Sequence, residues 1–387
     1  MLNQCSDQLM SKNKNIYFSG LTGLRFFAAF AVVFSHIELY KHRAGIESLH
    51  HLNIYQHLGN QGVKIFFVLS GFLITYLLLA EKEQFKKINV KNFYIRRILR
   101  IWPVYFLVIA LSFFVFPLFI DSPFFSESIL ESKWIKFGLM LFILPNIVRY
   151  VFGPMLGINV LWSIGAEEQF YLIWPHLVNK FKSSLKYILI SILSLIVLTK
   201  GALILLESNL FNLSDSLIEK THLIYLLLDF DCMAIGALLA YFLFHQNKFL
   251  EYFKLISVQT ITALSLLALV ILKPELSFVN NLIYGCIYAI VILNAAANSK
   301  SIFTISSKLT DFLGLISYGV YMYHTLVMVL IFELIKDSNL TSIEFNLIFY
   351  ISSILLTIIV ASLSYFYLEK PILKFKRQFM LVKSGKI

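Results

Sequence analysis

Apolar stretches of about 20 residues follow one another along nearly the whole chain, with short polar segments between them. A membrane-spanning helix needs about 20 such residues, because the hydrocarbon core of a bilayer is ~30 Å thick. Of the 387 residues, 58% are hydrophobic and 14% are charged, which excludes a disordered chain, a coiled coil and an ordinary soluble enzyme. The pattern predicts an all-α polytopic membrane protein with about ten transmembrane helices.

The predicted spans leave room only for short loops. We therefore expect one transmembrane domain at 21–368, between a cytoplasmic N-terminal tail at 1–20 and a basic cytoplasmic tail at 369–387. A further apolar segment at 134–148 contains Gly138 and Pro145 and is short for a span, so we expect it to be re-entrant or interfacial. The ten predicted spans are 21–40, 61–80, 97–118, 161–178, 185–206, 221–245, 253–273, 278–297, 312–334 and 344–368.

The basic residues predict the orientation of the chain. Of 33 lysines and arginines, 22 fall on the side of the N-terminus and nine on the other side, if 134–148 does not cross. Cytoplasmic segments carry such an excess, so we expect both termini in the cytoplasm and a multi-pass protein of a bacterial inner membrane. The net charge of +11 is then explained by orientation and contact with membrane lipid, and we expect no nucleic-acid partner.

The sequence offers little for a metal ion. The three cysteines are isolated, and the loop at 41–60 holds four histidines without a nearby cysteine or carboxylate set. We therefore expect no metal and no structural disulfide. The phosphate-binding, nucleophile-elbow and zinc-protease motifs GxxxxGK[ST], GxSxG and HExxH do not occur.

Ionisable residues inside the predicted spans are costly and are candidates for function. In the first span, Arg25 and His36 are eleven residues apart, which places them on one helix face about 16 Å apart along the axis. At the cytoplasmic start of the third span, Arg96, Arg97 and Arg100 form a cluster that suits phosphate. Snorkelling and positive-inside orientation are the alternative explanations for these arginines.

Acids and a second histidine lie deeper. Glu167 and Glu168 are adjacent in the fourth predicted span, and Asp231 follows Asp229 in the sixth. His324 in the ninth span reaches nearly the depth of His36. Two histidines at matched depth with several carboxylates indicate a proton-handling centre rather than isolated packing contacts.

These motifs together resemble the acyltransferase-3 family of integral-membrane O-acyltransferases. The resemblance covers about residues 17–375, and it departs from the family pattern at 164–166, where Ile-Gly-Ala replaces the usual Leu-Ser-Val ahead of the two glutamates. The matching pieces are Arg25-x10-His36, GVKIFFVLSGFLIT at 62–75, RRILRIWPVY at 96–105, LWSIGAEEQFYL at 161–172, FDCMAIGALLA at 230–240, SYGVYMYHTLV at 317–327 and FYLEKP at 366–371.

The resemblance implies transfer of an acyl group, usually acetyl, from cytoplasmic acyl-CoA to a hydroxyl of a carbohydrate. The acceptor would be a cell-envelope or lipid-linked glycan, such as lipopolysaccharide O-antigen or exopolysaccharide. The family also implies ten spans and a long cytoplasmic connection between the eighth and ninth, at about 298–310. Some relatives carry a fused periplasmic SGNH domain, which we do not expect here because the sequence ends soon after the last predicted span.

The residues suggest a mechanism for such a reaction. We expect Arg25, Arg97 and Arg100 to orient the phosphates of acetyl-CoA, and His36 to deprotonate the acceptor hydroxyl or to take the acetyl group transiently. Glu167 or Glu168, with Asp231, would orient the sugar or His36, and His324 would stabilise charge near the thioester. The alternative function is a proton-coupled transporter or flippase, which also needs buried acids and histidines but not an arginine cluster at one mouth.

Overall fold

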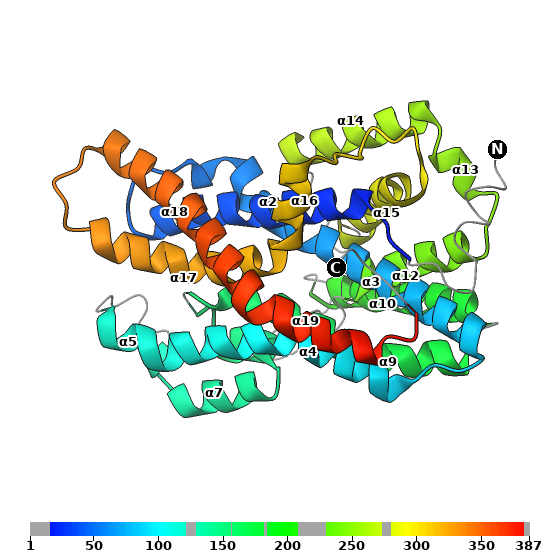
Figure 1. The fold of residues 1–387 in the computed structure, drawn as a ribbon. Coiled ribbons are helices and arrows are strands. Elements are labelled where there is room, and N and C mark those ends of the chain that lie inside the picture. Colours follow the sequence, from blue (N-terminus) through cyan, green and yellow to red (C-terminus); the bar gives the residue numbers. More distant parts are fainter. Residues whose placement is uncertain are drawn as a thin grey trace.

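The computed structural model describes residues 16–120, 129–155, 157–181, 184–207, 230–272 and 280–382. Helices make up its regular secondary structure in these ranges, and the longest of them run side by side as a bundle (Figure 1). The predicted all-α fold is confirmed.

Seven helical stretches in the described ranges are long and apolar enough to cross a membrane, judged by length and composition. They confirm a polytopic membrane protein. The seven are α2 (Gly20–Arg43), α3 (Asn53–Phe85), Val90–Phe119 beginning with α4 (Val90–Ala110), Leu185–Ala202 within α10 (Leu185–Glu207), α15 (Asn280–Ala297), α17 (Ser317–Ile335) and Ser342–Phe379 beginning with α18 (Ser342–Ser364).

Three further predicted spans coincide with helices that do not reach this threshold. They are α9 (Trp162–Lys180), α12 (Asp231–Phe244) and α14 (Ile256–Leu272). α12 and α14 have only 14 and 17 residues, and the predicted spans around them extend into parts of the chain outside the described residues. The total of ten spans therefore stays a prediction.

The segment at 134–148 does not form a spanning helix. It folds into α7 (Lys133–Leu141) and α8 (Pro145–Phe152), with 9 and 8 residues. At 1.5 Å per residue each is at most about 14 Å long, less than half the thickness of the hydrocarbon core. Two amide hydrogen bonds of 3.1 Å between Asn146 and Gln169 fasten α8 to α9.

Glycines allow α3 and α12 to cross in backbone contact. A Cβ atom placed on Gly71 of α3 would lie 1.9 Å from the Met233 carbonyl oxygen, and one on Gly236 of α12 would lie 2.1 Å from that of Val68. Small residues at such crossings let apolar helices approach closely, and dispersion contacts then hold them together. Two of the sequence motifs, at 62–75 and 230–240, thus meet at this crossing.

We expect Gly71→Ala to destabilise the protein by at least about 1–3 kcal/mol, because the added methyl group forces the two backbones apart. The measurement is the temperature at which the detergent-purified protein loses its monodisperse peak. Gly138→Ala on α7 is the matched control, since nothing lies within 4 Å of the position that its added methyl group would take. Equal melting of the two variants would show that the crossing tolerates separation.

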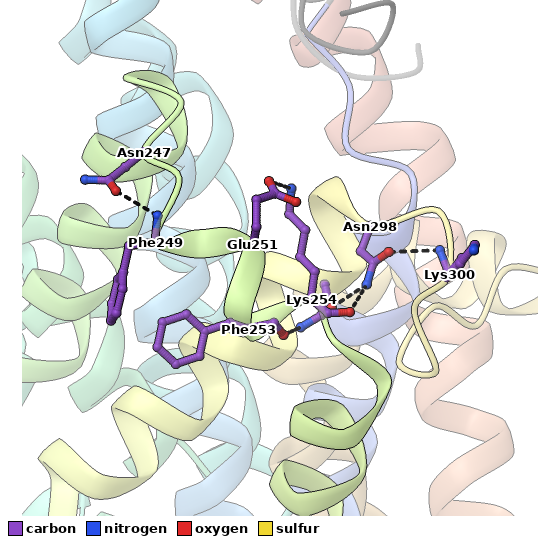
Figure 2. A network of polar contacts seen from close by, with 8 residues as sticks. Asn247, Phe249, Glu251, Phe253, Lys254, Asn298 and Lys300 are labelled. Carbon is purple, nitrogen blue, oxygen red and sulfur yellow. Dashed lines mark hydrogen bonds and ion pairs between the residues drawn. The ribbon is translucent and has the colours of Figure 1, made fainter. Parts of the chain in front are cut away.

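Polar side chains tie α13 (Leu250–Phe253), α14 and α15 together at one end of the bundle. The Asn298 amide donates to the Lys254 carbonyl oxygen at 3.1 Å and accepts from the Lys300 backbone N–H at 3.0 Å (Figure 2). Lys254 stands at the start of the seventh predicted span and Lys300 follows the eighth, so the alternation of spans predicts both on the same side of the membrane. The structure places them at one end of the bundle, as that topology requires.

The stretch predicted as a basic tail continues the last long helix. α18 passes through a π-helical turn (Tyr365–Glu369) into α19 (Lys370–Lys376), which packs against α4 (Figure 1). A short 3₁₀ turn (Arg377–Phe379) follows. The C-terminal residues up to 382 thus lie against the bundle beside the arginine cluster of α4.

Candidate active site

Two histidines from distant parts of the sequence meet inside the bundle. The Nδ1 atom of His36 on α2 lies 3.0 Å from the Nε2 atom of His324 on α17, and the ring centroids are 5.1 Å apart. The side chain of His324 is fully buried. The matched depth predicted from the sequence becomes a direct contact in the structure.

The hydrogen bonds of His324 assign the tautomer of both rings. Its Nδ1 atom lies 2.8 Å from the carbonyl oxygen of Tyr321, which can only accept, so Nδ1 carries the proton. The Nε2 atom of neutral His324 is then an acceptor, and Nδ1 of His36 must donate to it. This leaves the lone pair of His36 on Nε2, the state of a general base whose orientation is fixed by a second group.

Hydrogen bonds to the segment before α9 hold the two histidine helices in place. Thr325 on α17 donates to the Gly157 carbonyl oxygen at 2.6 Å, and the Gly157 N–H donates to the Tyr40 hydroxyl on α2 at 2.8 Å. Gly157 has a φ of 80°, a conformation that glycine adopts without strain. Ser163 and Tyr321 add a hydroxyl contact of 2.7 Å. The histidine pair is therefore supported from both helices.

The two glutamates of α9 differ in their partners. Glu167 is satisfied on both oxygens, by Ser70 at 2.9 Å and by Tyr171 at 2.6 Å. Glu168 accepts from the Trp102 indole at 3.2 Å through one oxygen, while its buried Oε1 has no hydrogen-bond partner in the described residues. An unsatisfied buried carboxylate oxygen is costly and suggests a site that a ligand completes.

Arg25, Arg97 and Arg100 gather near the other end of α2. Arg25 lies close enough to Arg100 and Arg97 of α4 to be repelled by their charges. The Arg97 guanidinium lies 5.6 Å and 5.7 Å from the ring centroids of Phe93 and Tyr171, and its buried Nε has no hydrogen-bond partner in the described part of the chain. None of the three arginines forms an ion pair within the described ranges. Such donors fit an anionic ligand with several oxygens.

Arg96 differs from its neighbours in the cluster. It donates to the Glu81 carboxylate at 3.0 Å and to the Phe379 carbonyl oxygen at 2.8 Å. These contacts join the end of α3, the start of α4 and the C-terminal stretch. The sequence placed Arg96 with the donor-binding residues, whereas its observed partners are structural.

Asp231 also has partners of its own. Its carboxylate pairs with the ammonium of Lys200 at 2.8 Å, with both side chains buried, and accepts from the Cys232 N–H at 2.9 Å. Neither His36 nor His324 is among its described contacts. The pair joins α10 to α12, and we assign it to packing. Asp229 lies outside the described residues.

Tyrosines of α17 connect the arginine end to the histidine pair. Tyr318 lies close enough to Glu369, Glu168 and Arg100 to interact with their charges. Tyr321, one turn deeper, experiences that of Glu167, and its ring centroid lies 6.0 Å from that of His324. One face of α17 thus carries polar groups from the arginine cluster to the site of the base.

Three residues near the cluster were not singled out from the sequence. Tyr171 contacts both Glu167 and Arg97, Glu369 is 7% exposed and acts on Arg100, and Lys376 experiences the charges of four arginines. Tyr171 and Glu369 lie inside the motifs at 161–172 and 366–371, so the motifs could have identified them from the sequence. Lys376 lies beyond all the motifs, so only the fold could find it.

Among the described residues, no three histidine, cysteine, aspartate or glutamate side chains are grouped as metal ligands would be. The rings of His42, in the last turn of α2, and of His50 have their centroids 5.0 Å apart and their planes tilted by 32°.

Comparisons with known proteins identify the family of the chain. The family described as "Acyltransferase domain" matches residues 18–366. The chain is 27% identical over 386 residues to the O-acetyltransferase OatA of Staphylococcus aureus, covering 92% of this chain and 57% of that protein. It is 28% identical over 387 residues to the putative peptidoglycan O-acetyltransferase YrhL of Bacillus subtilis, covering 92% and 55%.

A third relative, the peptidoglycan O-acetyltransferase OatA of Listeria monocytogenes, is 33% identical over 167 residues, which cover 41% of this chain and 24% of that protein. The chain thus spans little more than half the length of the relatives from Staphylococcus aureus and Bacillus subtilis. No solved structure matches. Because the family match covers nearly the whole sequence, this chain belongs to the acyltransferase-domain family of membrane proteins.

Proposed function

We propose that this protein transfers an acetyl or other short acyl group from cytoplasmic acyl-CoA to a hydroxyl group of a cell-envelope carbohydrate. The observation that carries the proposal is the layout of α2. One end of this helix presents Arg25 to an arginine cluster suited to phosphate, and about 16 Å deeper on the same face stands a histidine held as a base.

Three guanidinium groups at one end of α2 support a binding site for the acyl donor. Arg25, Arg97 and Arg100 are basic groups without ion-pair partners in the described ranges, and a CoA thioester carries several phosphate oxygens that would satisfy them. The thioester end of the donor would then extend along the polar face of α17 toward the histidine pair.

The reaction needs a base, because a sugar hydroxyl is not ionised at neutral pH. In the proposed step, Nε2 of His36 takes the hydroxyl proton as the hydroxyl oxygen bonds to the thioester carbonyl carbon. The carbon–sulfur bond then breaks, and the proton passes from His36 to the leaving thiolate. A transient acetyl group on His36 is the alternative route from the same position.

The remaining polar groups support this step. His324 keeps the His36 ring in the required tautomer and steadies the imidazolium that forms. Oε1 of Glu168, which has no hydrogen-bond partner among the described residues, would accept a hydrogen bond from a substrate hydroxyl or amide. Glu167, satisfied by Ser70 and Tyr171, would fix the position of α9 and of the Tyr171 ring beside Arg97.

The acceptor is proposed from the relatives. Those from Listeria monocytogenes and Bacillus subtilis are named for peptidoglycan, so we place peptidoglycan first among the candidate envelope carbohydrates, ahead of lipopolysaccharide O-antigen and exopolysaccharide. The arginine cluster and both chain ends would face the cytoplasm of a bacterium, and the acceptor would approach from the opposite side of the inner membrane.

Purified protein in lipid nanodiscs, incubated with radiolabelled acetyl-CoA and envelope glycans, tests the proposal. Label transferred to a glycan and released by mild base would establish O-acetylation, and separate incubations with peptidoglycan fragments, O-antigen and exopolysaccharide would identify the acceptor. Glycan that stays unlabelled while a pH gradient drives substrate across vesicles would instead support a transporter.

A further inference from the structure

The C-terminal stretch from Lys370 to Val382 lies over the arginine cluster, and we call it the C-terminal strap. Its helix α19 packs against α4, and the turn that follows packs there too. Arg96 fastens the strap by donating to the Phe379 carbonyl oxygen, while its other nitrogen holds Glu81 at the end of α3. Glu81 in turn accepts from the Asn89 N–H at 2.8 Å, so the anchor reaches three elements.

A cleft separates the strap from α3 and α4. The cleft is partly open to solvent, and side chains of α3, α4 and the strap line it. Leu77, Met380 and Val382 form apolar parts of its wall. Arg97 and Lys376 contribute basic side chains, and the carboxylate of Glu81 is paired with Arg96. The strap therefore supplies both kinds of surface that a nucleotide-bearing ligand needs, apolar contacts for a ring and positive charge for phosphate.

Lys376 lies among other positively charged side chains. The charges that act on it are those of Arg25, Arg96, Arg97 and Arg100. Within the described residues it forms no ion pair and no hydrogen bond, although its side chain is partly buried. Like charges that are partly removed from water repel one another, and a bound polyanion is the simplest way to offset that repulsion.

We infer that the C-terminal strap is one wall of the donor site, where Lys376 and Arg97 bind a phosphate group of the donor and Arg96 positions the strap. The inference rests on the proposed function and deepens it. It separates Arg96, which acts through Phe379, from Arg97, which touches the ligand. The same chemistry would also hold the phosphate of an anionic lipid headgroup.

The test measures the binding of CoA to the full-length protein in nanodiscs of phosphatidylcholine alone. Lys376→Met keeps most of the apolar stem and removes the charge, and we expect it to weaken CoA binding about 10- to 100-fold, the effect of losing one charge-assisted hydrogen bond. Lys374→Met is the matched control, because Lys374 lies on the same helix and is exposed. We expect it to bind CoA as the unaltered protein does.

Arg96→Gln provides a second, independent measurement. Without the bond to Phe379, the strap should be cleaved faster by a protease at Arg377 or Lys376, and added CoA should slow that cleavage in the unaltered protein. Lys376→Met should fold normally and lose this protection by CoA.

The outcomes separate the inference from the proposed function. If the unaltered protein binds no CoA, the proposed donor is wrong. If it binds CoA and Lys376→Met binds equally well, the donor stands and the strap is not part of its site. In a second set of nanodiscs that contain phosphatidylglycerol, a Lys376→Met variant that binds less of this lipid but as much CoA as the unaltered protein would assign Lys376 to lipid and overturn the inference.

Discussion

His36→Gln is expected to lower kcat by about 10²–10⁴, the usual contribution of a positioned general base. Glutamine keeps a similar size and can still hydrogen-bond to His324, but it cannot accept and return a proton. Binding of acetyl-CoA should change little, because Arg25, the arginine of α2 that we propose to bind phosphate, is about 16 Å away along the helix. The measurement is initial-rate kinetics of acetyl transfer, with CoA binding measured separately on the same preparation.

His324 variants test the assigned tautomer. His324→Gln can still accept from Nδ1 of His36 through its amide oxygen and should retain more activity than His324→Leu, which leaves that N–H without a partner. The rate of the unaltered protein should rise with pH as the His36 ring loses its proton. A His36→Gln protein that turns over normally with an unchanged pH profile would exclude His36 as base and as nucleophile.

Arg97→Ala combined with Arg100→Ala is expected to raise the KM for acetyl-CoA strongly and the KM for the acceptor little. Two charge-assisted hydrogen bonds of ~1.5–3 kcal/mol each correspond to an effect of about 10²–10⁴ if they are additive, which is an upper bound. The measurement is the pair of KM values from initial rates in which one substrate is varied at saturating concentrations of the other.

Lys91→Ala is the control for the arginine pair, because Lys91 is exposed on the first turn of the same helix. It removes a positive charge from α4 without touching the cluster, so its KM for acetyl-CoA should stay close to that of the unaltered protein. An equal loss in the control and the double variant would mean that the arginines act only through general surface charge and membrane orientation.

Local sequence patterns were sufficient to predict the helices and the placement of Arg25 and His36 on one helix face. Apolar length predicts helices, and the spacing of Arg25 and His36 places both on one face because α2 is a single unbroken helix. The break at Pro145 likewise predicts that 134–148 does not form one long helix. These inferences succeed because they depend only on residues that are near one another in the chain.

Contacts between distant segments could not be derived in the same way. Nothing in the sequence distinguishes Arg96, which pairs with Glu81, from Arg97, which has no ion-pair partner in the described residues. The pairing of Asp231 with Lys200 depends on how α10 packs against α12. The contact between His36 and His324 depends on the packing of α2 against α17. The spacing of residues within one helix does not predict how two helices pack.

The unbroken α2 has a consequence for the choice of acyl group, if the donor binds as proposed. No glycine or proline lies between Arg25 and His36, so the unbroken helix fixes the distance between the phosphate end of the donor and the reacting carbon. Every donor must therefore place its thioester at the same depth, beside His36. Extra carbons in the acyl chain would then extend past the histidine pair, so the room beyond it, rather than the length of the donor channel, would set the longest acyl group that the protein accepts.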